Sequence, residues 1–149
     1  MIRIGHEDDG HEIASASGAI FNPHVDVVIA RADEDGKLMG GALYQDYTGP
    51  GGSMTIHVAG FAERWVNRDM LWICFDYPFD QLSIQRLYGR VKSTNERALE
   101  FDRKLGFKEV YREEGVFPDA DLVVMRMLKD ECRHLALKPK TVKSNLQEA

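Results

Sequence analysis

The sequence contains little cysteine and proline, and its positive charges are outnumbered by negative ones. Of its 149 residues, two are cysteine and five are proline, and the formal net charge is -5 at pH 7. Cys74 and Cys132 form no CxxC motif and no secreted disulfide pattern, so we expect reduced thiols and a cytoplasmic protein. The acidic balance argues against a broad nucleic-acid-binding surface, which needs clustered lysine and arginine.

Long apolar runs are missing as well. No stretch approaches the roughly 20 apolar residues that a transmembrane helix needs. The first ten residues, MIRIGHEDDG, also lack the apolar segment of a signal peptide. The sequence therefore predicts neither a membrane span nor a membrane partner.

The composition is that of a globular domain, with 44% hydrophobic and 29% charged residues. A chain of this length buries about 68–70% of its unfolded surface when it folds as one unit. We find no internal repeat and no dividing linker, and we predict a single domain over residues 1–137. Residues 138–149 contain few apolar side chains, which predicts a flexible tail.

Hydrophobic periodicity predicts an alternation of helices and strands. In the strand predicted over 53–60, Met54, Ile56 and Val58 share one face, and Thr55 and His57 share the other. The remaining elements, in chain order, are expected to be a helix ending near residue 20, a hairpin of strands 26–33 and 37–47, a buried helix over 64–79 that Pro78 kinks or ends, a strand over 86–92, a helix over 95–107, and strands over 108–115 and 121–128.

The predicted helix over 95–107, NERALEFDRKLGF, is short and amphipathic. Its apolar side chains recur at helical spacing and form one stripe. Ser93 and Glu96 have the spacing of a capping box, and Gly106 provides a left-handed stop. The segment before it, YPFDQLSIQRLYGRVKST, contains a helix end, a tight connection and an alternating strand.

Together these two segments resemble the C-terminal half of the GNAT superfamily of acyl-CoA N-acyltransferases, in which a strand, an asparagine and a helix ending in Leu-Gly-Phe follow the cofactor-binding helix. The ribosomal-protein N-acetyltransferase branch and small phage or prophage proteins of this type are the most similar. The resemblance implies an α+β fold, with a central, mostly antiparallel sheet of about six or seven strands that is splayed in the middle and flanked by helices.

The same resemblance implies an activity. Acetyl-CoA, as a co-substrate, would lie between the strands at 53–60 and 86–92, with its pyrophosphate at the start of the following helix, where unpaired N–H groups and the helix dipole favour anions. The acceptor would be a primary amine of a protein or a small molecule, and a homodimer is compatible with the family. The implied cofactor-binding residues are Val58, Arg64, Asn67, Arg68 and Asn95.

The chain departs from the family at the pyrophosphate signature. Ala62, Trp65 and Asn67 occupy positions where the family places glutamine or arginine and two small residues. Arg64 and Arg68 lie one helical turn apart and would supply charged contacts instead. Alternatively, they form a solvated helix edge and Trp65 plugs a vacated site. The chain would then be a catalytically degenerate binding or structural protein of the same fold. A phage origin is one form of this alternative.

For catalysis, His57 is the candidate base, since an imidazole with a pKa near 6.5 can accept a proton at neutral pH. The alternative is a packed, hydrogen-bonded histidine. Asn95 is the second candidate, through contacts with the pantetheine arm or an ordered water, and its alternative role is a helix cap. Asp102 replaces the tyrosine that family members often place near the sulfur, and we expect it to be a surface charge. Tyr88 lines the acceptor cleft or simply packs.

The segment HEDDGHE, over residues 6–12, superficially resembles a metal-binding motif. Its histidines are five residues apart with Gly10 between them, which is not the HExxH spacing. A solvated helix start accounts for it, and we predict no metal site.

Overall fold

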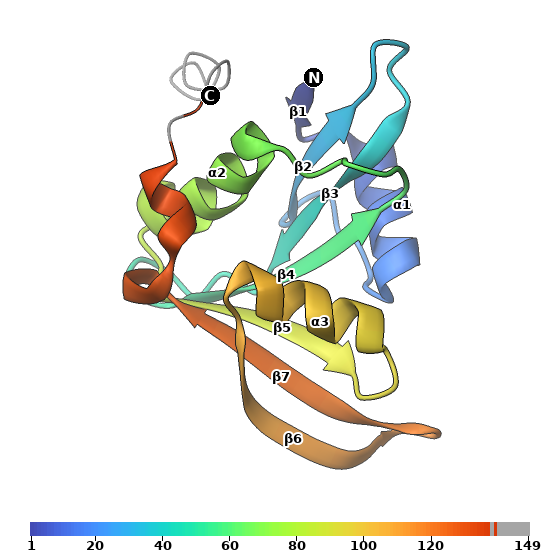
Figure 1. The fold of residues 1–149 in the computed structure, drawn as a ribbon, viewed down its shortest axis with the longest axis vertical. Coiled ribbons are helices and arrows are strands. Elements are labelled where there is room, and N and C mark those ends of the chain that lie inside the picture. The colour runs from blue at the N-terminus through green and yellow to red at the C-terminus, as the bar shows by residue number, and fades with distance from the viewer. Residues whose placement is uncertain (138, 140–149) are drawn as a thin grey trace.

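The computed structural model describes residues 1–137 and 139, which form three α-helices and a seven-stranded sheet (Figure 1). The predicted tail over 138–149 lies outside the described residues except for Pro139, and the domain boundary stays a prediction. The helices are α1 Glu7–Ser17, α2 Arg68–Asp76 and α3 Glu96–Leu105. The strands are β1 Ile2–Ile4, β2 Val27–Ala32, β3 Leu38–Gln45, β4 Ser53–Gly60, β5 Arg86–Lys92, β6 Lys108–Phe117 and β7 Ala120–Leu128.

The sheet has the strand order β1-β2-β3-β4-β5-β7-β6. Every neighbouring pair is antiparallel except β4 and β5, which run parallel. The predicted mixed fold with a mostly antiparallel sheet is therefore confirmed. β1 was not predicted, because three residues are too few to show an alternating pattern. It extends the sheet by pairing with β2.

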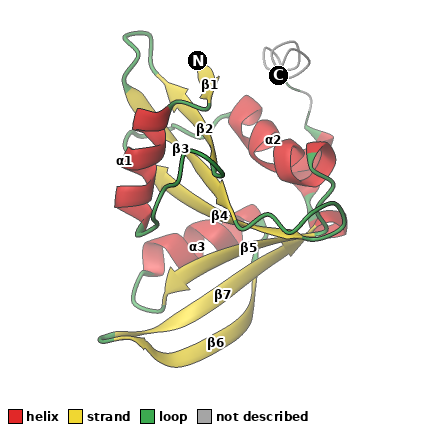
Figure 2. Ribbon diagram, turned by 180° about the vertical axis from the view of Figure 1, so that it is seen from behind, coloured by secondary structure: helices red, strands yellow, loops and turns green. Residues whose placement is uncertain are grey.

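Helices cover both faces of the sheet (Figure 2). On one face, Ile13 and Ala14 of α1 pack against Val28, Ala30 and Leu43. On the other face, α2 and α3 bury the larger core, which includes Tyr44, Ile56, Phe75, Leu99 and Met125. Side chains of a strand alternate between faces, so Leu43 faces α1 while its neighbour Tyr44 faces α2.

The centre of the sheet is splayed. β4 and β5 pair at only three positions, Ser53 with Arg86, Met54 with Leu87 and Thr55 with Tyr88. β4 then runs on to Gly60 and β5 to Lys92 without further pairing, and the two strands diverge in Figure 1. The predicted splay is therefore confirmed, and it leaves a gap in the sheet between two strands.

The helix predicted over 64–79 begins later and is divided. Asn67 caps α2, since its Oδ1 accepts the Met70 N–H at 2.9 Å, and the residues before it form a loop. α2 ends at Asp76, and a π-helical turn over Tyr77–Gln81 contains Pro78. A proline is tolerated in the first turn of a helix because its missing N–H would find no partner there.

The predicted capping box of Ser93 and Glu96 is wrong. The N-cap of α3 is Asn95, whose Oδ1 accepts the Ala98 N–H at 3.1 Å. Ser93 instead accepts the Asp121 N–H on its Oγ at 2.9 Å. The predicted stop is confirmed, because Gly106 ends α3 with a φ of 115°.

A 3₁₀ turn over Arg133–Ala136 fastens the end of α3 to the core. Arg133 donates to the Lys104 carbonyl, and His134 Nε2 lies 2.7 Å from the Leu105 carbonyl oxygen. The buried His134 ring also stacks on Phe75, with 4.7 Å between ring centroids. Because a carbonyl oxygen can only accept a hydrogen bond, this contact requires the His134 tautomer that carries a hydrogen on Nε2. Burial lowers the pKa of His134 and favours the neutral ring.

No helix among residues 1–137 is long and apolar enough to cross a membrane.

Candidate functional site

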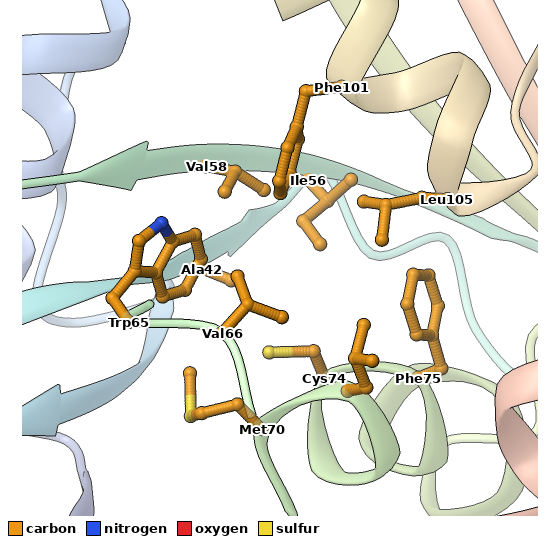
Figure 3. A pocket seen from close by; sticks show the side chains of 11 residues that line it. Ala42, Ile56, Val58, Trp65, Val66, Met70, Cys74, Phe75, Phe101 and Leu105 are labelled. Atoms are coloured by element: carbon orange, nitrogen blue, oxygen red, sulfur yellow. The ribbon is translucent and has the colours of Figure 1, made fainter. Parts of the chain in front are cut away.

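An apolar hollow lies beside the splay on the face covered by α2 and α3 (Figure 3). It measures about 330 Å³ when the part open to solvent is counted, but its interior cavity is only about 20 Å³, roughly the room that one water molecule needs. Ile56 and Val58 of β4 line it from the sheet, and Phe101 and Leu105 line it from α3. The lining is apolar throughout and suits an acyl group or an aliphatic arm rather than a charged group. Val58, predicted to bind the cofactor, therefore lies in this hollow.

Trp65 closes one end of the hollow. Its indole lies so close to Gly40 and Gly60, partners across β3 and β4, that a Cβ at either glycine would collide with it. The ring also stacks on Phe101 of α3, with centroids 6.3 Å apart. Trp65 therefore joins the loop before α2 to both the sheet and α3. The two glycines explain how a residue this large fits where the family places a small one.

Several backbone N–H groups near the start of α2 are engaged within the protein. The Phe61 and Ala62 N–H groups both donate to the Met39 carbonyl, at 2.8 and 3.1 Å. The Asn67 side chain accepts a hydrogen bond from the Met70 N–H. Asp69 is buried in the first turn of α2, where its carboxylate complements the helix dipole. The Phe61, Ala62 and Met70 N–H groups are therefore not available to a bound anion. The backbone argument for a pyrophosphate site is correspondingly weak.

Arg64 and Arg68 remain the candidate anion contacts. Both side chains are exposed, and among residues 1–137 and 139 neither guanidinium has a hydrogen bond or ion pair. Arg64 has a left-handed backbone, with a φ of 57°, which is unfavourable for a residue with a Cβ. Arg31 holds this conformation by donating to the Arg64 and Trp65 carbonyls at 2.7 and 2.9 Å.

Asp102 is not the surface charge that we expected. Its carboxyl is half buried over β5, where a Cβ at Gly89 would lie 3.2 Å from Oδ2. No described residue forms an ion pair or hydrogen bond with this carboxyl, and burial raises its pKa from 3.8 to about 7. The sequence carried a signal for this position. Asp102 lies four residues after Ala98 and three before Leu105, which places it on the apolar stripe of α3.

His57 lies on the opposite face of the sheet, next to the same gap. It stands two residues beyond Thr55, the last residue of β4 that pairs with β5. Its ring is half buried, and burial is the main reason that its pKa is lowered, with Asp46 acting in the opposite direction and Arg90 in the same one. The neutral imidazole, which can accept a proton, is therefore the favoured form at neutral pH.

The structure thus brings His57 and Asp102 to the two sides of the splay and places the other predicted residues around it. Asn95 lies at the start of α3 with its side-chain oxygen engaged in the cap. Asn67 is likewise a cap, at the start of α2. Tyr88 is half buried on the His57 face, as the partner of Thr55.

One carboxylate of the HEDDGHE segment, that of Asp9, binds an arginine of β1. Asp9 accepts two hydrogen bonds from the Arg3 guanidinium, each 2.7 Å long. Among the described residues, no three or more histidine, cysteine, aspartate or glutamate side chains are placed to hold a metal ion.

Neither a protein-family model nor a curated protein sequence matches the chain. Solved structures do. A mutant form of the spermidine/spermine N-acetyltransferase SpeG from Vibrio cholerae superposes with a TM-score of 0.64 at 16% identity, over 87% of this chain and 95% of that one. A GNAT-family acetyltransferase from Bacillus anthracis superposes with a TM-score of 0.62 at 12% identity, over 87% and 95%. Identity this low bears on architecture alone, and the architecture of this chain is the GNAT N-acetyltransferase fold.

Proposed function

We propose that the chain is an N-acetyltransferase that transfers the acetyl group of acetyl-CoA to a primary amine. The observation that carries the proposal is the splay between β4 and β5, with a candidate base, His57, on one face and a candidate acid, Asp102, on the other. The hollow beside the same gap is small but has the apolar lining that the acyl end of the co-substrate requires.

Transfer requires a proton to leave the amine and a proton to reach the departing sulfur. Acetyl-CoA supplies an activated thioester, whose C–S bond breaks as the N–C bond forms. His57, neutral near pH 7, accepts the proton of the amine. Asp102 retains its proton up to a pH of about 7 and donates it to the sulfur, so that an amide and a free thiol result. Together, the two side chains handle both proton transfers at one gap.

The binding residues divide into two groups. Val58 contributes to the apolar hollow, and Arg64 and Arg68, which have no ion pair among the described residues, offer positive charge near the start of α2 for the phosphates. Asn67 and Asn95 support the site by capping α2 and α3. Phosphate binding would therefore rest on side chains more than on backbone amides, and we expect it to weaken with added salt.

A titration with acetyl-CoA tests the proposal. Specific binding raises the melting temperature with ligand concentration, because a ligand that binds only the folded state stabilises it. Val58→Trp should fill the hollow and abolish this shift, whereas Val110→Trp, at an exposed position on the edge strand β6, should not. No shift in the wild-type protein, measured up to millimolar acetyl-CoA, would contradict the proposal.

One set of observations favours a second candidate, a GNAT-fold protein that has lost catalysis and serves as a binding or structural protein. The Asn67 cap, the buried Asp69 and the packed Trp65 all occupy the region where the family binds pyrophosphate. The absence of acetyl-CoA binding would favour this candidate. The ribosomal-protein branch, a phage origin, a cytoplasmic location and a homodimer stay predictions.

A further inference from the structure

A row of polar side chains crosses the sheet on the His57 face. Thr55, Tyr88, Arg126 and Lys108 are successive Cα partners on β4, β5, β7 and β6. The alternation of β7 fixes the direction of Arg126, because its neighbours Met125 and Met127 are fully buried in the core on the other face. α1 packs over β2, β3 and β4 on the His57 face. Figure 1 shows α1 over this part of the sheet, and β5, β7 and β6 extend away from it.

Arg126 has an unexplained polar atom. Its Nε is buried and forms no hydrogen bond with any described residue. A buried donor without a partner is unfavourable, and such atoms in native proteins usually find a water or a ligand. The guanidinium is planar and matches the two oxygens of a carboxylate. The residue is therefore poised to bind an anion.

The charges around His57 are divided between two sides. Arg90, two residues after Tyr88 on the same face of β5, is exposed and close enough to affect the imidazole. Asp26, just before β2, and Asp46, just after β3, act on the ring in the opposite sense. The carboxylates that act on His57 thus lie on its β2 and β3 side, and Arg90 lies on its β5 side. Beyond Arg126, Glu131 pairs with Lys108 at 2.6 Å and is also affected by the Arg126 charge. A molecule with separate positive and negative groups complements this arrangement.

We propose that the acceptor is a free amino acid, with its amino group at His57 and its carboxylate held by Arg126 and Arg90. This rests on the proposed N-acetyltransferase function and specifies its substrate. Paired neighbouring strands lie about 4.8 Å apart, so roughly 10 Å separates the backbones of β4 and β7 at Thr55, the last residue of β4 that pairs with β5. His57 stands two residues further along β4, and the side chains of His57 and Arg126 both shorten the distance that a bound amino acid must span.

Matched amines that differ only in the carboxylate test the inference. Release of free thiol from acetyl-CoA is measured with tyrosine against tyramine and with lysine against cadaverine. The amino acid of each pair should have a kcat/KM about 10- to 100-fold higher, as expected for a charge-assisted hydrogen bond. Arg126→Gln should remove this preference by raising KM for the amino acid. Arg112→Gln, at a partly exposed arginine on β6 that pairs with Glu109, should keep it.

The outcomes separate this inference from the function on which it rests. Turnover with equal or better use of the decarboxylated amines would overturn the inference and leave the acetyltransferase intact. So would a preference that survives Arg126→Gln. If no amine releases thiol, the proposed function fails. Binding then decides the inference. N-acetyl-tyrosine should raise the melting temperature of the wild type more than N-acetyl-tyramine does. Equal shifts would overturn the inference.

Discussion

Asp102→Asn should make the protein more stable at alkaline pH and less active. The wild-type carboxyl has a pKa raised from 3.8 to about 7, so the folded state binds a proton there more strongly than the unfolded state does. Between these two values the folded state carries the additional proton, and the free energy of unfolding therefore falls as pH rises. Asparagine has no proton to lose in this pH range, so the free energy of unfolding of the Asp102→Asn variant should lack this contribution to the pH dependence.

The magnitude follows from the same two values. At about 1.4 kcal/mol per pH unit, the interval from 3.8 to about 7 corresponds to at most about 4 kcal/mol. Water reaches the partly exposed carboxyl and screens it, which lowers our expectation to about 2 kcal/mol at pH 8. The free energy of unfolding of the Asp102→Asn variant should exceed that of the wild type by this amount at pH 8 and equal it near pH 4.

Urea unfolding at pH 4, 5, 6, 7 and 8 measures the effect as the difference between the two proteins. This difference cancels the contributions of His57 and His134, whose pKa values are both lowered and which destabilise the fold as pH falls. Asp130→Asn, at an exposed carboxyl, is the matched control and should show no such trend. If the difference between Asp102→Asn and the wild type is the same at every pH, the reasoning about this carboxyl is refuted.

Three further variants test other parts of the account. His57→Gln should lower amine-dependent thiol release by on the order of 10²–10⁴ without a comparable loss of melting temperature, and undiminished release would end its assignment as the base. Trp65→Ala should lower the free energy of unfolding by about 3 kcal/mol in urea titrations, because it removes the packing on the sheet and the stack on Phe101; a loss below about 1 kcal/mol would contradict that packing. Asn95→Ala should cost about 1 kcal/mol in thermal unfolding through the lost cap, and no change would show that the cap is dispensable.

Local signals predicted much of the fold. The alternation of Met54, Ile56 and Val58 correctly placed β4 and its two faces, and Gly106 correctly marked the end of α3. The splay followed from the family resemblance, since strand pairing depends on partners distant in sequence. The start of α2 was misjudged, because Trp65 and Val66 are apolar enough to continue the helical pattern and only the Asn67 cap fixes the boundary.

The site was harder to predict than the fold. His57 was singled out by its residue type and its strand face, both of which are local properties. The place of Asp102 on the apolar stripe of α3 was a local signal, but the extent of its burial depends on the approach of α3 to Gly89, a contact between two elements. Trp65 was expected to obstruct phosphate, and its fit depends on Gly40, a residue 25 positions earlier in the chain. Arg126 lies in a strand predicted correctly, and only the full sheet reveals that its Nε has no partner in the part of the chain that the structure describes.

The central claim is that His57 and Asp102 move protons across one gap during acetyl transfer. Its most direct test is the pH dependence of kcat/KM for amine-dependent thiol release from acetyl-CoA, measured for the wild type, His57→Gln and Asp102→Asn. We predict a bell-shaped wild-type profile, with a rising limb below pH 6.5 that His57→Gln removes and a falling limb near pH 7 that Asp102→Asn removes. A wild-type protein without amine-dependent thiol release, or one whose profile neither substitution changes, would contradict the claim.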